Sequence, residues 1–475
     1  MTPIPLPITN GFYVSESLPV SAQECVNWYP VVNPVASLSQ EMLIGTPGIS
    51  QLATSGTRKQ GNRGGHVMDG VAYFVNGLML YRLNDDFTVA EIGAIAGAGR
   101  VSMADNGTQL MVLAPGGNGY IYNKATDAFV QITDTDFTAN GVPQYVVFID
   151  GYFVVTTSSK KFIVSALNNG ISWNALDFGT AESDPDDIVA PVVYKNQLFI
   201  TGSQTTEAFQ NMGGGGFPFQ RNGLFLSKGV FAPFSLINTQ DSFMFIGGGR
   251  NESPAVWSLV GNGTQKISTP AIENILQRLT KAELTAVYAW VYAQKGAYFV
   301  GFALPDSTIV YDIVCQRWHE RKSYTNSTQQ AYRVSSIVTA YGKVICSDTI
   351  DGRFGSLDPD VYTEYGANIV RTVATQPFQN NMKSMFVPII ELTVESGVGN
   401  AAADDPVITM DRSKDGKTWQ APRPRKIGKV GEYGHRAIWR RNGRVARFEV
   451  FRFTLSDPVK PVIIQLTATI VGGDK

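Results

Sequence analysis

The sequence predicts an all-β protein with a β-propeller-like domain, a C-terminal β-sandwich and one inserted helix. Short apolar stretches with period-2 alternation recur along most of the 475 residues and are separated by glycine-rich turns. Glycine is abundant, with 47 residues, and charged residues make up only 17% of the chain, against about 25% in an average globular protein. Many tight turns and few charged helical faces produce this composition. A chain of this length is expected to hold two or three domains.

A repeated unit predicts the propeller over residues 61–365. From about His66 onward, a strand, a short turn, a second strand and a looser connection to a third strand recur. The turns carry Asp-Gly, Lys-Asn, Lys-Gly or Tyr-Gly pairs, which favour β-hairpins. Seven units can be counted at a spacing of roughly 33 to 50 residues, which is the size of a propeller blade. We therefore expect six to eight blades, with two stacked β-sandwiches as the alternative.

The regions outside the repeats have a different character. Residues 1–60 are proline-rich and show little periodicity, so we expect an extended arm pinned by Trp28 and Tyr29. Residues 371–471 contain longer alternating strands with a basic, aromatic middle, which predicts a separate C-terminal β-sandwich.

One helix is expected near residues 270–280. Ser268 and Thr269 precede Pro270, and a hydroxyl N-cap followed by proline in the first turn is a strong start signal. Apolar residues then fall at helical spacing, at Ile272, Ile275, Leu276 and Leu279.

Charge and cysteine content restrict the environment of the chain. The formal net charge is -1, so no global field attracts nucleic acid or an anionic membrane. The N-terminus shows no signal peptide, and no apolar run approaches the roughly 20 residues that span a bilayer. Three distant cysteines, Cys25, Cys315 and Cys346, suit assembly in a reducing compartment. We expect no membrane span.

The sequence lacks the residue sets that catalysis requires. His66, His319 and His435 stand alone, and the aspartates at 184–187 and 404–405 lack the spacing of a calcium loop. No P-loop, nucleophile elbow, CxxC pair or complete GxGxxG is found. We therefore expect a protein that is not an enzyme and has no cofactor, metal or catalytic residue.

Residues Ser413 to Trp419 resemble the Asp-box hairpin of sialidases and other propellers. A glycan-active or carbohydrate-binding propeller is therefore an alternative function. An Asp box stabilises a turn, however, because its aspartate caps the turn and its tryptophan packs beneath it. With one copy, outside the repeats, the motif favours a structural turn.

The segment Arg412–Arg452 is strongly basic. It holds thirteen Lys and Arg against three acidic residues, interleaved with aromatic residues. Three interpretations remain open: a solvated strand face, a subunit interface rich in Arg and aromatics, and a surface that follows nucleic-acid phosphates. As a protein interface, the candidate residues are Trp419, Trp439, Arg440, Arg441 and Arg444, the last four placed around a hairpin expected at Asn442-Gly443.

Several segments together resemble the packaged-DNA stabilisation proteins of short-tailed bacteriophages, also called tail accessory, hub or nozzle proteins. The likeness rests on segments spread in order along the chain: GTPGI (45–49), GAGRVSMA (97–104), SWNALDFGTAESDPDDI (172–188), TTEAFQNMGGGGFPFQR (205–221), ISTPAIENIL (267–276), and DGKTW with GEYGHRAIWRRNGRVARFEVFRF near the C-terminus. The family is structural, so the resemblance transfers no catalytic residue.

The resemblance implies a virion tail protein that is made in the host cytoplasm and closes the portal vertex after DNA packaging. It implies a ring of six copies below the portal adaptor, which stabilises the packaged genome and forms part of the ejection channel. It also implies attachment sites for a tail needle or plug and for tailspikes or fibres, with double-stranded DNA as a transient passenger.

Overall fold

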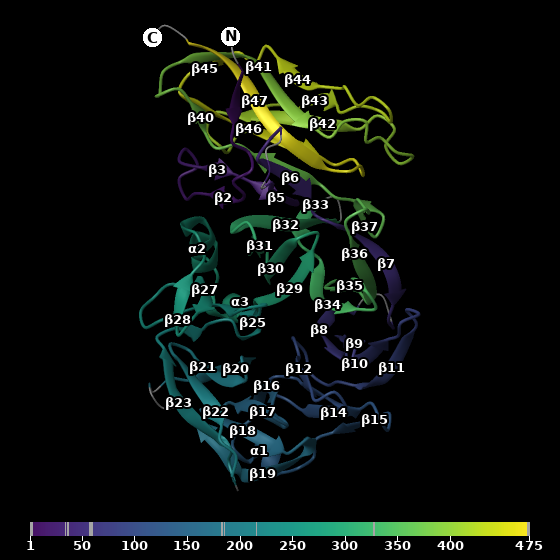
Figure 1. The fold of residues 1–475 in the computed structure, drawn as a ribbon, viewed down its shortest axis with the longest axis vertical. Coiled ribbons are helices and arrows are strands. Elements are labelled where there is room, and N and C mark those ends of the chain that lie inside the picture. The colour runs from purple at the N-terminus through teal and green to yellow at the C-terminus, as the bar shows by residue number, and fades with distance from the viewer. Residues whose placement is uncertain are drawn as a thin grey trace.

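A computed structural model of the protein describes residues 3–33, 35, 38–56, 60–181, 184, 186–214, 216–325 and 328–472. Figure 1 shows two parts: a ring of small sheets, and a sandwich of longer strands seated against the rim of that ring. The expected all-β class, the propeller and the C-terminal sandwich are confirmed.

Seven antiparallel sheets form the blades of the propeller in the part of the chain that the structure describes. The first four blades are continuous in sequence. They comprise β8 (Asn62–Met68), β9 (Val71–Asn76), β10 (Met79–Leu83) and β11 (Val89–Ala94); β12 (Ser102–Asp105), β13 (Gln109–Leu113), β14 (Gly119–Asn123) and β15 (Ala128–Gln131); β16 (Pro143–Ile149), β17 (Tyr152–Thr157), β18 (Lys161–Ala166) and β19 (Asn169–Thr180); and β20 (Ile188–Tyr194), β21 (Gln197–Gly202), β22 (Thr206–Asn211) and β23 (Phe219–Leu226).

The last three blades are less regular. In the fifth blade, two short strands share one neighbour: β24 (Gly229–Val230) and β25 (Ile237–Asn238) both pair with β26 (Phe243–Gly248), which leads to β27 (Ala255–Val260) and β28 (Gly263–Lys266). The sixth comprises β29 (Tyr288–Gln294), β30 (Ala297–Ala303), β31 (Thr308–Asp312) and β32 (Arg317–Thr325), with β33 (Thr328–Ala331) added to β32. The seventh comprises β34 (Val334–Ala340), β35 (Lys343–Asp348), β36 (Arg353–Asp358) and β7 (Gly48–Thr54), and continues into β37 (Thr363–Glu364) and β38 (Ala367–Asn368).

The blades close into a ring through their inner strands. Strands β8, β12, β16, β20, β25, β29 and β34 contact one another in that order, and β34 returns to β8. The outer strand of the seventh blade comes from the other end of the domain, because β7 pairs with β36 along its whole length (Figure 1). Closure of the ring thus joins residues about 300 positions apart in the chain.

The first 60 residues differ from the extended arm that the sequence suggested. Besides β7, they supply β1 (Pro3–Leu6), β5 (Trp28–Val32) and β6 (Glu41–Gly45) to the sandwich, β4 (Cys25–Val26) to the junction, and a hairpin of β2 (Tyr13–Val14) and β3 (Ala22–Gln23). Trp28 and Tyr29 are buried, as expected of anchoring residues. These strands could not be recognised in the sequence because most of them are too short to show alternation and the region is rich in proline.

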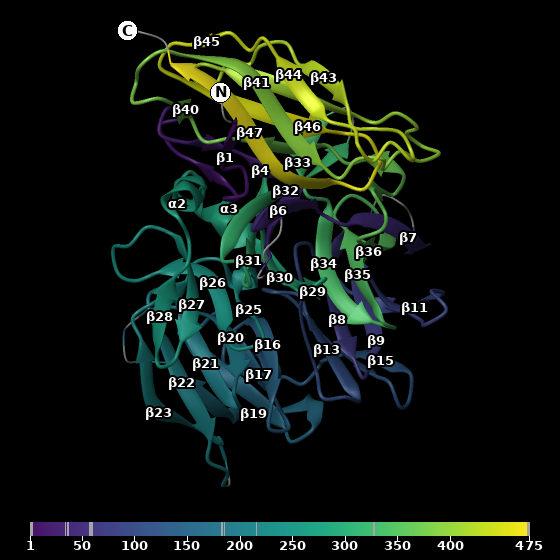
Figure 2. The same ribbon diagram turned by 45° about the horizontal axis from the view of Figure 1, so that its top comes forward.

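The sandwich consists of two sheets, and each sheet combines strands from the N-terminal and the C-terminal part of the chain. One sheet orders β44 (Ala437–Arg440), β41 (Met385–Val394), β47 (Val462–Gly472), β6 and β5, with β1 on β47 and β45 (Arg444–Val445) on β41. The other orders β4, β39 (Arg371–Ala374), β46 (Phe448–Leu455), β42 (Val407–Ser413) and β43 (Arg423–Lys426), with β40 (Phe378–Gln379) on β46. Figure 2 shows the long strands β41 and β47 crossing above the blades.

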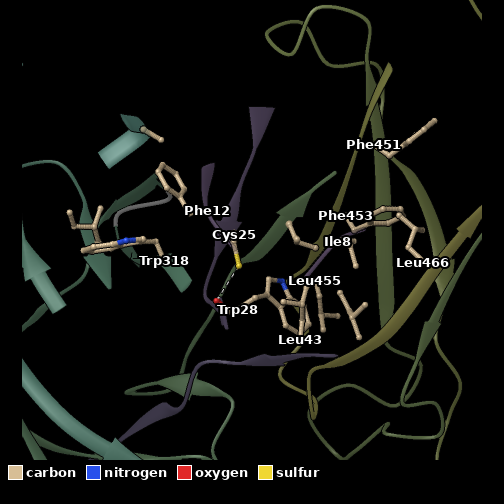
Figure 3. Packing of buried hydrophobic residues seen from close by; sticks show 14 of the residues in the cluster. Ile8, Phe12, Cys25, Trp28, Leu43, Trp318, Phe451, Phe453, Leu455 and Leu466 are labelled. Carbon is tan, nitrogen blue, oxygen red and sulfur yellow. Dashed lines mark hydrogen bonds between the residues drawn. The ribbon is translucent and has the colours of Figure 1, made fainter. Parts of the chain in front are cut away.

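Strand β4 makes the sixth blade and the second sandwich sheet one continuous sheet. Val26 pairs in parallel with Glu320 of β32 and antiparallel with Thr372 of β39. The hydrophobic core is continuous as well: Figure 3 shows Cys25 and Trp28 between Trp318 on the propeller side and Phe453 on the sandwich side. The two domains therefore meet as one packed body.

The side chain of Asn27 holds this junction together. Its Nδ2 donates to the carbonyls of Lys322 and Val370, both at 2.8 Å, and its Oδ1 accepts from the Lys322 N–H at 3.0 Å. Its own carbonyl accepts from the Thr46 N–H at 3.0 Å. Asn27 is 1% exposed and has a φ of 58°, a conformation that asparagine tolerates better than most residues.

Close backbone contacts explain the two glycines of the GTPGI segment. The Gly45 N–H donates to the Pro461 carbonyl at 3.0 Å, and a Cβ there would lie 2.2 Å from Pro461 Cγ. The Gly48 N–H donates to the Val361 carbonyl at 2.9 Å, and a Cβ there would lie 2.4 Å from that oxygen. The segment is the crossing from the sandwich to the closing strand of the propeller.

The expected helix is present as α2 (Pro270–Gln277), packed on the core through Ala271, Ile272 and Leu276. Its N-cap Thr269 makes no side-chain capping bond, and the neighbouring Ser268 hydroxyl donates to Glu273 at 3.1 Å instead. Further short helical segments were not predicted: α1 (Asp136–Ala139), η1 (Pro233–Ser235) and α3 (Lys281–Ala286), which begins with a Thr280–Glu283 capping box.

We predict that Asn27→Ala lowers the free energy of unfolding by about 4 kcal/mol, because buried backbone groups lose their partners and alanine is strained at positive φ. Asn27→Gly should cost about 3 kcal/mol, since glycine relieves only the strain. Urea unfolding followed by tryptophan fluorescence measures both. Two variants as stable as the wild type would show that the amide does not hold the junction.

Burial at the junction also affects Glu364, in β37. This side chain is 5% exposed, and burial raises its pKa to about 7 despite the opposing effects of Ser323, Arg333 and Arg371. The folded state therefore binds more protons than the unfolded state between pH 4.5 and 7. Stability from this group is present at low pH and is lost as pH rises through that window.

We predict that the stability of the wild type relative to Glu364→Gln falls by about 3 kcal/mol between pH 4.5 and pH 8. Glutamine cannot ionise, so the comparison isolates this carboxyl from other titrating groups. Urea unfolding of both proteins at the two pH values gives the difference. A difference that does not change with pH would contradict the assignment.

Candidate interaction surface

The Asp-box segment forms a capped turn on the second sandwich sheet. Asp415 Oδ1 accepts the N–H groups of Lys417 and Thr418, both at 2.8 Å, and the Ser413 hydroxyl at 2.9 Å. These bonds hold the pKa of Asp415 well below its usual range. Trp419 lies half-buried, with the Arg452 guanidinium 3.8 Å above its ring. The motif acts as a turn here.

Trp439 is a core residue. It is 0% exposed, its Nε1 donates to the Arg423 carbonyl at 2.7 Å, and its ring lies 5.4 Å from that of Phe453. Its ring is therefore inaccessible to a partner while the sandwich is folded. The inclusion of Trp439 among exposed contact residues is corrected: alternation along β44 turns Trp439 inward and Arg440 outward.

The hairpin expected at Asn442-Gly443 is absent from this described segment. Strands β44 and β45 both pair with β41 in the same direction, Arg440 opposite Ile389 and Arg444 opposite Phe386. Four residue steps on one strand therefore oppose three on the other, which makes a β-bulge. The Asn-Gly pair misled the prediction because positive φ serves bulges as well as turns; here Arg441 has a φ of 56°.

Buried hydrogen bonds fix the bulge. Asn442 is 1% exposed; its Nδ2 donates to the Trp439 carbonyl at 2.9 Å and its Oδ1 accepts from Arg423 at 2.6 Å. Arg412 donates to the Asn442 carbonyl and pairs with the buried Glu449. The bulge is rigid, and it aims the arginines on either side of it outward.

The arginines of the basic segment thus divide into two groups. One group is engaged within the fold: Arg412, Arg423, Arg425, Arg436 and Arg452 bond carboxylates or backbone carbonyls. In the described part of the chain, the other group makes no side-chain hydrogen bond or ion pair and is exposed: Arg440, Arg441, Arg444 and Arg447. We call this second group, with Lys383, Met382 and Phe386 beside it, the arginine surface.

The arginine surface lies on β41, β44 and β45 and the segments next to them, at the end of the sandwich away from the propeller (Figures 1 and 2). Phe386 is 48% exposed and Met382 57% exposed. Sequence reasoning identified three of the arginines. It missed Arg447, and it missed Phe386 because FVPII is an uninterrupted apolar run that reads as core.

The aspartates considered as cation ligands serve the fold. Asp186 accepts backbone N–H groups from the loop between β21 and β22 at 2.7 and 3.0 Å. Asp184, Asp404 and Asp405 each pair with a basic side chain. Within the described residues, no group of three His, Cys, Asp or Glu could hold a metal ion, and no helix could cross a membrane.

Side chains from several blades meet on the propeller axis. The Arg100 guanidinium lies 3.8 Å above the Tyr288 ring and donates to the Ser335 hydroxyl at 2.9 Å. Phe234 lies 5.9 Å from the same guanidinium and stacks edge-on against Tyr145. Burial lowers the pKa of Arg100 to about 10, so it stays charged at neutral pH. Arg100 thus contacts side chains of the fifth, sixth and seventh blades.

Known proteins resemble the chain over both domains. A family model described as Bacteriophage P22 Gp10, beta-propeller, matches residues 4–362, and one described as Bacteriophage P22 Gp10, beta-sandwich, matches residues 371–471. The chain belongs to the P22 Gp10 family. Membership of the P22 Gp10 family supports a structural role as a phage tail hub and a place in the virion, and it is consistent with a protein that is not an enzyme.

One relative agrees with the P22 Gp10 assignment. The tail hub protein gp10 of Salmonella phage P22 is 24% identical over 383 residues, covering 76% of this chain and 78% of that protein. Among solved structures, the WD40 propeller domain of Doa1 aligns with 66% of this chain and 98% of its own, at 12% identity and a TM-score of 0.40. The N-terminal domain of Nup159 aligns with 68% and 97%, at 10% identity and a TM-score of 0.39.

We predict that Trp439→Ala lowers the free energy of unfolding by about 4 kcal/mol, because it leaves a cavity in the sandwich core. Arg440→Ala and Arg441→Ala should each change it by less than about 0.5 kcal/mol, because both side chains are exposed and neither has a hydrogen-bond or ion-pair partner among the described residues. Thermal or urea unfolding distinguishes the two classes. Equal losses in all three variants would mean that the arginines also support the core.

Proposed function

We propose that this protein is a tail hub of a short-tailed phage that closes the portal vertex after packaging and stabilises the packaged genome. It forms part of the DNA ejection channel and carries attachment sites for a tail needle or plug and for tailspikes or fibres. The observation that carries the proposal is the match of both domains, in order and over nearly the whole chain, to the P22 Gp10 models.

In this proposal the protein works as a ring, of six copies in the simplest case, attached to a portal adaptor. The contacts of Arg100 with Tyr288 and Ser335, which join different blades across the ring, support a channel that runs between copies instead of through one propeller. The near-neutral net charge of -1 suits a passage for DNA, because each phosphate contact would retard exit.

The arginine surface supplies a contact to a neighbouring copy of the chain or to the portal adaptor. Arg440, Arg441 and Arg444 are its projecting members, and interfaces concentrate binding energy in such residues. Trp439 supports this sheet from the core, whereas Trp419 lies on the other sheet of the sandwich, stacked with Arg452.

We predict that phage carrying Arg440→Ala with Arg441→Ala package DNA but yield leaky or tail-deficient heads, while the isolated protein still folds. Truncation of such arginines often costs 2 kcal/mol or more of binding, and many copies multiply the loss. Electron microscopy of particles and a nuclease-protection assay of packaged DNA provide the measurement.

Lys414→Ala with Lys417→Ala is the matched control, because it removes the same charge from the Asp-box turn. The control should give intact tails. Normal tails and retained genomes in the Arg440/Arg441 variant would show that the segment is a solvated strand face and not an interface. Complete particles that lack this protein altogether would overturn the proposed function.

A further inference from the structure

The arginine surface carries positive charge that the chain does not neutralise. Arg440, Arg441, Arg444 and Arg447 are exposed and have no acidic partner in the described part of the chain. Other arginines of the same domain are paired with carboxylates: Arg412 with Glu449, Arg436 with Glu391 and Arg452 with Asp411. Four unpaired arginines beside exposed Phe386 are the composition of a protein interface, where Arg and aromatic residues are enriched.

Charge is distributed unequally along the chain. The sandwich and the junction, residues 1–47 and 367–475, carry 17 Lys and Arg against 13 Asp and Glu, a net charge of +4. The propeller, residues 48–366, carries 22 Lys and Arg against 27 Asp and Glu, a net charge of -5. The net charge of -1 hides a molecule whose sandwich end and propeller end have opposite signs.

A closed ring of identical copies needs two different surfaces on each copy that complement each other. The opposite charges of the two domains meet this requirement. We infer that the arginine surface of one copy binds the negatively charged propeller of a second copy; the inference rests on the proposed ring.

The apolar residues favour a protein over duplex DNA as the partner. Phe386 and Met382 lie among the arginines with 48% and 57% of their surface exposed. In duplex DNA the bases are stacked and their faces are covered, so a phosphate-binding surface gains nothing from such groups. A protein partner buries them and excludes water around the arginines, which strengthens the charge pairs.

Zero-length carbodiimide cross-linking of purified virions tests the contact. The reagent couples lysine amines to carboxylates in direct contact, and Lys383 is the exposed lysine beside the arginines. We expect a species of twice the 51.7 kDa chain mass in which Lys383 is joined to an Asp or Glu of residues 48–366. Lys383 joined only to another polypeptide, or joined to nothing, would overturn the inference.

Charge reversal provides the matched comparison. Arg440→Glu with Arg441→Glu should reduce this Lys383 species at least about tenfold, because like charges across an interface cost several kcal/mol. Lys414→Glu with Lys417→Glu makes the same charge change on the Asp-box turn and should leave it within about twofold.

Two other outcomes count against the inference in different ways. An unchanged dimer in the Arg440/Arg441 variant, with binding of a short DNA duplex lost, would assign the surface to nucleic acid and leave the proposed function intact. Absence of the wild-type chain from tails would defeat the proposed function itself.

Discussion

The position of the sandwich on the propeller depends on the hydrogen bonds of a single buried amide. The Asn27 side chain bonds the sixth blade at Lys322 and the entry to the sandwich at Val370, while its backbone carbonyl holds Thr46 ahead of the closing strand β7. The segments that contain Thr46, Lys322 and Val370 therefore all bond the same residue, Asn27. Because an unpartnered buried amide is costly, only one arrangement of the two domains satisfies it.

Buried charge reinforces that arrangement. Arg371 is fully buried where β39 leaves the junction, and burial lowers its pKa to about 10, with Glu364 as its acidic neighbour. A Cβ on Gly45 would lie 2.7 Å from Arg371 Nε, so the backbone is packed tightly around the guanidinium. A charge buried this deeply tolerates little movement of its surroundings, so the connection between the two domains is stiff.

Local sequence patterns predicted the blades, but the pairing of strands far apart in the chain could not be predicted from the sequence. The hairpins could be predicted because turns such as Asp150-Gly151 and Lys195-Asn196 adopt positive φ. Such turns favour particular residues, which are visible in the sequence. Strands β4 and β7 gave no such signal, since their stability comes from partners hundreds of residues away. At the arginine surface, composition identified the right segment, but the bulge at Asn442 and the inward Trp439 follow from neighbours on β41 and β46.

The shared strands also set the order in which the protein can be completed during synthesis. The ribosome makes the N-terminal strands first, yet β7 waits for β36, and β1 waits for β47 at the opposite end of the chain. The middle blades can form as they emerge, whereas β7 stays unpaired until β36 has been made and β1 until β47 has been made. A truncated chain leaves an open ring and bare strand edges, so only full-length copies present the finished surfaces from which a tail is built.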